Sequence, residues 1–215
     1  MEDVLEIYKR PYNSRYPVVC MDESNKQLKI SKAEEIPSQP GKTRKIETRY
    51  ESNGVSNIFL SFEPLAGKRF VTIAPRRRRL DWAAHIQHLV ENIYAKAERI
   101  ILIVDNLNIH TGAALYETLP PQRARKILDK LEIHYTPKHG SWLHIAEIEL
   151  SHLARQCINR RIGTQQILAE EVAFWCKERN QWGAAVNWQF TTQEARIKLK
   201  KLYPDINNKV KINEM

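Results

Sequence analysis

The chain has 215 residues, of which 42% are hydrophobic and 27% charged, which fits one globular domain with its own core and excludes a disordered polypeptide. Its formal net charge of +9 favours a polyanionic partner, nucleic acid first, although many other proteins are equally basic. No apolar run approaches the length of a membrane span, and the start MEDVLEIYKR lacks the apolar stretch of a signal peptide, so we expect a cytoplasmic protein without a membrane partner.

The first part of the chain is predicted to form strands, with a long polar segment between the first two. The run PVVCMDE at 17–23 is typical of a short buried strand that ends in two acids. Residues 24–54 form a polar insert with prolines and a glycine near its middle, and an insert of this length is either functional or partly structured. The β-branched and aromatic runs at 55–64 and 67–74 flank a short turn and predict a hairpin.

The middle of the chain alternates helix and strand. Asp81 can cap a helix that continues to about residue 97 with apolar residues at helical spacing. Residues 99–106 contain five consecutive apolar residues, which predicts a central strand that is buried on both faces. A helical segment interrupted by two prolines follows at about 112–130, and LEIHYTP at 131–137 is typical of another strand.

The last third is predicted to be helical. Helices are favoured at about 142–159 and 164–179, and a capping box at Thr191 and Glu194 starts another that stops before Pro204. Strands first and alternation afterwards predict an α/β domain, a mixed five-stranded sheet flanked by helices, with extra C-terminal helices.

Three acids stand where such a sheet could bring them together. Asp22 and Asp105 end two of the strongest predicted strands, and Glu147 lies in the helix after the last strand. Three carboxylates from separate elements suit a site for two magnesium ions, since hard cations prefer oxygen ligands. An aspartate at a strand end is more often a turn or cap residue, so the pattern alone indicates this site only weakly.

Longer motifs surround these acids. They are VVCMDE, EPLAGKRFV, DWAAHI, IILIVDNLNIHTGAALYE and, above all, HYTPKHGSWLHIAEIELSHLARQCINRRI. Together they resemble the insertion sequence 630 family, the bacterial branch of the mariner-like transposases, over about residues 1–203. The resemblance implies an RNase H-like catalytic domain at 17–203, preceded by a linker remnant at 1–16 and followed by a tail at 204–215.

The resemblance also implies the metal site. Asp22, Asp105 and Glu147 match the family's Asp-Asp-Glu triad, which holds two Mg²⁺ ions for which Mn²⁺ can substitute. Glu149 is the competing third ligand, because both glutamates flank the apolar stripe of their helix and periodicity does not separate them. The motif favours Glu147. Glu23 should point to the opposite side of its strand from Asp22, where its role would be supporting or structural.

Neighbouring polar residues match the family pattern as well. Asn106, Asn108 and His110 follow the second aspartate, where they would orient the carboxylate, touch the scissile phosphate or satisfy only their own loop. His144 departs from the family, whose members commonly carry Asn there, three residues before the triad glutamate. A histidine at this position would hydrogen-bond near the metal or mark a decaying copy of a mobile element.

Two basic groups are candidate DNA contacts, each with a solvated loop as the alternative. Lys138 and His139 precede the helix that carries the triad glutamate. The densest basic run is Arg76, Arg77, Arg78 and Arg79, which could grip the DNA backbone.

The resemblance implies a DNA transposase that cleaves and joins strands of a mobile element. Its partners would be the element ends and target DNA, and a second copy of the chain is a further candidate partner. Only 16 residues precede the first strand, so the family's helix-turn-helix region is expected to be missing or supplied by another chain, as in a truncated copy or a split reading frame. Such a protein would associate with the bacterial nucleoid when it acts. Two alternatives stay open: an RNase H-like nuclease without strand transfer, and an inactive remnant that only binds DNA.

Overall fold

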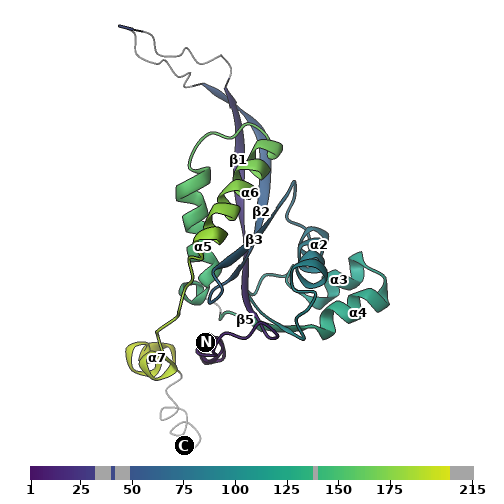
Figure 1. The fold of residues 1–215 in the computed structure, drawn as a ribbon, viewed down its shortest axis with the longest axis vertical. Coiled ribbons are helices and arrows are strands. Elements are labelled where there is room, and N and C mark those ends of the chain that lie inside the picture. The colour runs from purple at the N-terminus through teal and green to yellow at the C-terminus, as the bar shows by residue number, and fades with distance from the viewer. Residues whose placement is uncertain (32–39, 42–48, 138–139, 204–215) are drawn as a thin grey trace, which may run out of the picture.

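The computed structural model describes residues 1–31, 40–41, 49–137 and 140–203 and contains one five-stranded sheet (Figure 1). The strand order is β3-β2-β1-β4-β5, with antiparallel pairing from β3 to β1 and parallel pairing from β1 to β5. The bounds are Val18–Ser31 (β1), Tyr50–Glu63 (β2), Lys68–Ala74 (β3), Ile100–Val104 (β4) and Leu131–Tyr135 (β5). This arrangement confirms the expected mixed sheet of an RNase H-like domain.

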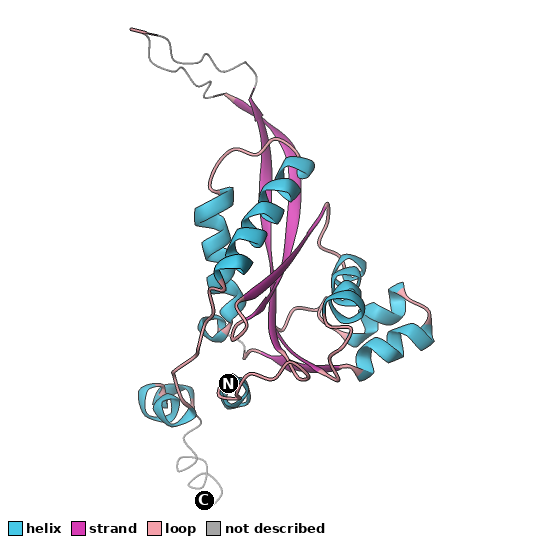
Figure 2. Ribbon diagram, viewed as in Figure 1, coloured by secondary structure: helices cyan, strands magenta, loops and turns pink. Residues whose placement is uncertain are grey.

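Helices cover both faces of the sheet (Figure 2). The bounds are Glu2–Tyr8 (α1), Arg79–His88 (α2), Gly112–Thr118 (α3), Pro121–Asp129 (α4), Ile145–Leu153 (α5), Gln165–Trp182 (α6) and Thr192–Lys198 (α7). Single π-helical turns extend α2 over Leu89–Ile93 and α5 over Ala154–Ile158, and 3-10 turns occupy Ser141–Leu143 and Lys200–Leu202. The helices α5 and α6 pack on one face, and α2, α3 and α4 on the other.

Side-chain alternation along the central strands divides the core into two. Cys20 and Ile103 belong to the cluster under α5 and α6, whereas Met21 and Val104 belong to the cluster under α2. All five residues of β4 are buried, which confirms the prediction of a central strand. Successive residues of a strand face opposite sides of the sheet. The register therefore determines the face towards which the next polar residues of these strands project.

The first strand is longer than the sequence predicts. It does not end at its two acids but continues to Ser31, paired with the start of β2 and shifted in register between Gln27 and Lys29. Part of the polar insert at 24–54 is therefore a long hairpin arm. The sequence does not predict this arm, because few of its side chains are buried. Backbone pairing rather than an apolar pattern maintains the strand here.

Two helix starts also differ from expectation. Asp81 is not the N-cap of α2 but its third residue, and its carboxylate accepts a hydrogen bond from the backbone N–H of Arg78, 3.0 Å away. Within 1–16, expected as a linker, α1 buries Val4 and Ile7 in the core, and the Tyr8 hydroxyl donates to the Leu143 carbonyl at 2.8 Å. The tail at 204–215 lies outside the described residues.

A close backbone approach joins the β2–β3 turn to the end of α6. Gly67 has φ +63°, and a Cβ there would lie 2.8 Å from the carbonyl carbon and oxygen of Gly183. We expect Gly67→Ala to lower the free energy of unfolding by about 1–3 kcal/mol, because the left-handed backbone and the overlap both disfavour a side chain. Thermal unfolding measures this. The control Gly54→Ala has a similar φ of +85° in open space, so an equal loss there would contradict a steric role for Gly67.

Among the described residues, no helix combines the length and apolar character needed to cross a bilayer.

Candidate functional site

Two of the three predicted acids emerge side by side from neighbouring parallel strands. The strand β1 pairs with β4 through Cys20 and Ile103, and Asp22 and Asp105 each lie two residues beyond this pair. Along β1 two residues restore the same face, so the Asp22 carboxyl projects towards the side covered by α5, and Asp105, the first residue after β4, lies near enough for its charge to act on Asp22. The strand β4 ends at Val104, so Asp105 stands at the edge of the sheet. The strand β1 continues past Asp22, so of these two strands only β4 provides a strand end at this place.

The third acid comes from the first turn of α5. Buried Ile145 and Ala146 pack this helix against the face that carries Asp22, and Glu147 follows them with an exposed side chain. Burial and then the negative charge of Asp105 raise the pKa of Glu147. Burial raises the pKa of Asp22 to about 7, with contributions from the charges of Glu23, Asp105 and Glu147. The three carboxylates therefore lie close enough to repel one another.

This carboxylate cluster suits a divalent cation. Among the described residues, no lysine or arginine forms an ion pair with Asp22, Asp105 or Glu147. The Asp22 carboxylate accepts a hydrogen bond from the Glu23 backbone N–H at 2.7 Å, and its side chain is 13% exposed. Apart from His110 beside Asp105, these carboxylates have no cationic partner among the described residues, and oxygen ligands of this kind are the donor set that Mg²⁺ and Mn²⁺ prefer.

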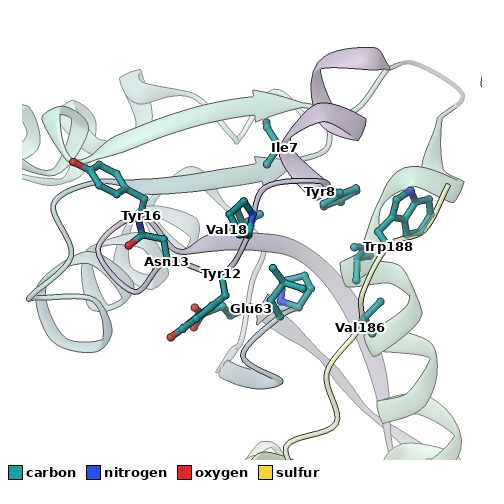
Figure 3. Close-up of a pocket in the computed structure, with 13 residues that line it drawn as sticks. Ile7, Tyr8, Tyr12, Asn13, Tyr16, Val18, Glu63, Val186 and Trp188 are labelled. Carbon is teal, nitrogen blue, oxygen red and sulfur yellow. The ribbon is translucent and has the colours of Figure 1, made fainter. Parts of the chain in front are cut away.

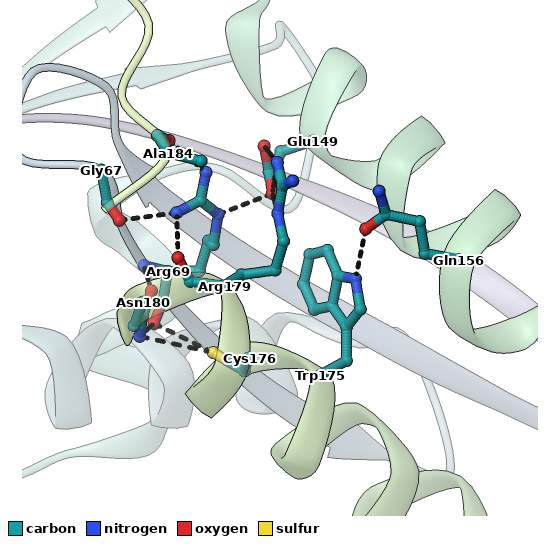
Figure 4. Close-up of polar contacts among 9 residues, drawn as sticks. All are labelled: Gly67, Arg69, Glu149, Gln156, Trp175, Cys176, Arg179, Asn180 and Ala184. Atoms are coloured by element: carbon teal, nitrogen blue, oxygen red, sulfur yellow. Dashed lines mark hydrogen bonds and ion pairs between the residues drawn. The ribbon is translucent and has the colours of Figure 1, made fainter. Parts of the chain in front are cut away.

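The competing glutamate faces elsewhere. Glu149 is buried, and its carboxylate lies 2.6 Å from Arg69 Nε and 3.1 Å from Arg179 Nη2 (Figure 4). Arg69 comes from β3 and Arg179 from α6, so both oxygens of Glu149 serve to tie α5 to its neighbours. Glu147 is thus the glutamate of this helix that lies with the aspartates.

His110 joins the second aspartate to the acid on the opposite face. Its Nδ1 lies 2.7 Å from Asp105 Oδ1, and its Nε2 lies 2.6 Å from Glu23 Oε1. Burial alone would lower the pKa of His110, but the hydrogen bonds to Asp105 and Glu23 raise it to about 10. The same contact lowers the pKa of Asp105 despite its partial burial. Glu23 lies across the strand from Asp22 as expected, but its link to His110 could not be read from the sequence.

His144 is enclosed beside the first aspartate. Its Nε2 donates to the Met21 carbonyl at 3.0 Å and lies 3.9 Å from Asp22 Oδ2, beyond hydrogen-bond distance. Burial lowers the pKa of His144 to about 4, so the ring is neutral. Asn106 and Asn108 are exposed in the loop between Asp105 and His110, which leaves their side chains facing solvent near the cluster.

The predicted DNA contacts divide into paired and unpaired residues. Arg78 bonds Asp81 at 3.0 Å and Arg79 bonds Glu117 at 2.6 Å, whereas Arg76 and Arg77 are exposed with no ion pair to another described residue. Lys138 and His139 lie outside the described residues.

A separate hollow lies between α1, the start of β1 and the segment after α6 (Figure 3). Tyr8, Tyr12 and Trp188 line it together with the buried carboxyl of Glu63, and its volume of about 20 Å³ has room for a single water molecule. The three clustered carboxylates are not part of its wall.

The raised pKa of Asp22, caused by burial and then by neighbouring charges, predicts a pH-dependent gain in stability for Asp22→Asn without divalent ions. The folded-state pKa of about 7 lies above the ordinary value of 3.8, so the wild type loses stability as pH rises from about 4 to about 7. The variant lacks this loss and should be more stable at pH 8, by at most about 4 kcal/mol, with a smaller gain at pH 5. Thermal unfolding in EDTA at both pH values measures it, with Asp129→Asn on α4 as the control. A gain that does not grow with pH would contradict the raised pKa of Asp22.

Comparison with known protein families identifies the family of the chain. A family model described as DDE superfamily endonuclease matches residues 17–169. No curated protein sequence matches the chain significantly. Two solved structures are similar to it. One is the Mos1 strand transfer complex, with 16% identity over 85% of this chain and 55% of that chain and a TM-score of 0.48. The other is the simian T-cell lymphotropic virus intasome in complex with PP2A regulatory subunit B56 gamma, with 11% identity, coverage of 93% and 60%, and a TM-score of 0.41. The chain spans 55–60% of the length of these two chains.

Proposed function

Because the chain belongs to the DDE superfamily endonucleases, we propose that it is the catalytic domain of a DNA transposase of the insertion sequence 630 family, which cleaves and transfers the strands of a mobile element. The observation that carries the proposal is the gathering of Asp22, Asp105 and Glu147, where burial and then the charges of Glu23, Asp105 and Glu147 raise the pKa of Asp22. Carboxylates held together against their own repulsion indicate a site built for a cation.

In this proposal Asp22, Asp105 and Glu147 hold two Mg²⁺ ions, with Mn²⁺ as a substitute. When bound, the ions would activate the attacking oxygen and stabilise the leaving oxygen of the scissile phosphate. The protein contributes position: two ligands come from adjacent strands of a buried sheet, and the third from a helix that the core holds against them.

The neighbours of the triad have supporting roles in this proposal. His110 fixes the Asp105 carboxylate, and the exposed Asn106 and Asn108 lie where they can contact the DNA phosphate. His144 donates to the β1 backbone beside Asp22 and, as a neutral ring, adds no charge to the cluster. Lys138 and His139 would contact phosphate at the entrance to α5.

The partners in this proposal are the element ends and target DNA, which a second copy of the chain binds as well. Such a protein would work in the cytoplasm at the nucleoid. A strand-transfer assay with a pre-cleaved DNA end and Mn²⁺ tests the reaction. Joined products support the transposase, cleavage without joining identifies a nuclease, and DNA binding without either identifies an inactive remnant.

The unpaired arginines before α2 should carry part of the DNA affinity. We expect Arg76→Ala and Arg77→Ala each to weaken binding uniformly across sequences and to reduce the slope of log affinity against log salt by about 1, since one phosphate contact is lost. Arg79→Ala, whose side chain is engaged by Glu117, should change the slope less. Fluorescence anisotropy across a salt series measures the slopes. Equal slopes in all three variants and the wild type would show that these arginines do not contact DNA phosphates.

A further inference from the structure

The buried connection from Glu23 through His110 to Asp105 crosses the end of the sheet. Asp105 is the first residue after β4, and Glu23 lies on β1 one residue after Asp22; ligand atoms of Glu23, Asp105 and His110 all lie within 4.8 Å of one another. His110 lies between them with both ring nitrogens engaged: Nδ1 lies 2.7 Å from Asp105 Oδ1 and 3.1 Å from the Asp105 backbone carbonyl oxygen, and Nε2 lies 2.6 Å from Glu23 Oε1. Ionised carboxylates only accept hydrogen bonds, so each ring nitrogen donates.

His110 itself is held from several sides. Its ring packs against Trp82 of α2, with centroids 5.7 Å apart, and neither the His110 nor the Glu23 side chain is exposed. Its backbone carbonyl accepts from the Tyr135 hydroxyl at 2.8 Å, and its backbone N–H donates to the Leu107 carbonyl at 3.0 Å. An imidazole fixed in this way permits little rotation of the carboxylate that it binds.

Stability alone does not explain the buried Glu23. One of its oxygens bonds His110, but the other, Oε2, is buried without a hydrogen-bond partner among the described residues. A buried carboxylate that is only half satisfied contributes little to folding, since its desolvation offsets the attraction to its partner. The buried position of Glu23 is explained by its contact with His110, which in turn contacts the Asp105 carboxylate.

We propose that Glu23 is a positioning residue: acting through His110, it fixes the orientation of the Asp105 carboxylate for divalent-ion binding. The inference rests on the proposed function, in which Asp105 is a metal ligand. Glu23 itself touches neither metal nor DNA in this scheme. Outer partners of this kind commonly change metal affinity or activity by about 10- to 100-fold when removed.

The test compares the Mn²⁺ dissociation constant from calorimetry with the half-saturating Mn²⁺ concentration for DNA cleavage. Glu23→Leu should raise both by about tenfold, with cleavage largely recovered at saturating Mn²⁺. Glu23→Gln should stay within about threefold of wild type, because its amide oxygen still accepts from His110. The control Glu63→Leu removes another buried acid of the same sheet, one that bonds Tyr94 at 2.9 Å, and should leave both values unchanged.

A double variant distinguishes action through His110 from a separate effect. His110→Gln should weaken Mn²⁺ binding at least as much as Glu23→Leu, and adding Glu23→Leu to it should have no further effect. Should Glu23→Leu not fold, His110→Gln cuts the same connection at its other end. Unchanged Mn²⁺ values in these variants, or equal losses in Glu63→Leu, would overturn the inference. A wild type that neither binds Mn²⁺ nor cleaves DNA would overturn the proposed function, and the inference with it.

Discussion

Asp105→Asn should abolish metal-dependent DNA cleavage, lowering the rate at least about a thousandfold, while leaving DNA binding intact or improved. The amide is a weaker ligand without charge, and loss of a bound ion removes several kcal/mol of transition-state stabilisation. Binding improves because one negative charge no longer faces the phosphates. Cleavage of a labelled duplex in Mn²⁺ and fluorescence anisotropy in EDTA measure the two effects.

The matched control is Asp129→Asn, which makes the same change on an exposed residue of α4 that pairs with Arg125. It should cleave like the wild type. Equal cleavage by Asp105→Asn and the wild type would contradict the role of Asp105, and loss of DNA binding together with cleavage would indicate a folding defect instead.

Arg69→Met should lower the free energy of unfolding by about 3 kcal/mol, because it leaves the buried Glu149 carboxylate with only the more distant Arg179 as a partner. The Arg69 side chain is not exposed, bonds Glu149 at 2.6 Å and donates to the carbonyls of Gly67 and Ala184 (Figure 4). Its guanidinium also lies over the Phe62 ring, 4.5 Å from the centroid. We expect the melting temperature to fall by roughly 10 °C.

Two variants check this interpretation. Arg79→Met removes an exposed arginine paired with Glu117 and should cost less than about 1 kcal/mol. The double variant Arg69→Met with Glu149→Leu should be more stable than Arg69→Met alone, since it also removes the buried carboxylate that Arg179 alone would have to neutralise. If Arg69→Met and Arg79→Met have the same effect on unfolding, the network around Glu149 is not what holds α5 and α6 to the sheet.

The sheet could be predicted where apolar pattern and strand coincide. The strand Ile100–Val104 is predicted correctly from the sequence, because burial on both faces requires five apolar residues in a row. The extension of β1 to Ser31 is not, since a hairpin arm with exposed faces has a polar sequence. The helix α1 was missed for a related reason, because seven residues carry too few turns for periodicity to be read.

The site could be predicted only in part. Asp22 and Asp105 were found because they follow apolar strand residues, and the structure adds the register that places them side by side. Glu149 could not be set aside from periodicity, since its partners Arg69 and Arg179 are distant in the chain. The link between Glu23 and His110 was hidden in the same way, because 87 residues separate the two.

A crystal soaked in Mn²⁺ and measured at the manganese absorption edge tests the central claim most directly. The account predicts anomalous density bounded by the Asp22, Asp105 and Glu147 carboxylates, on the side of the sheet that α5 covers. Density confined to the opposite side, between Glu23 and His110, or no ion near the three acids at millimolar Mn²⁺, would contradict it.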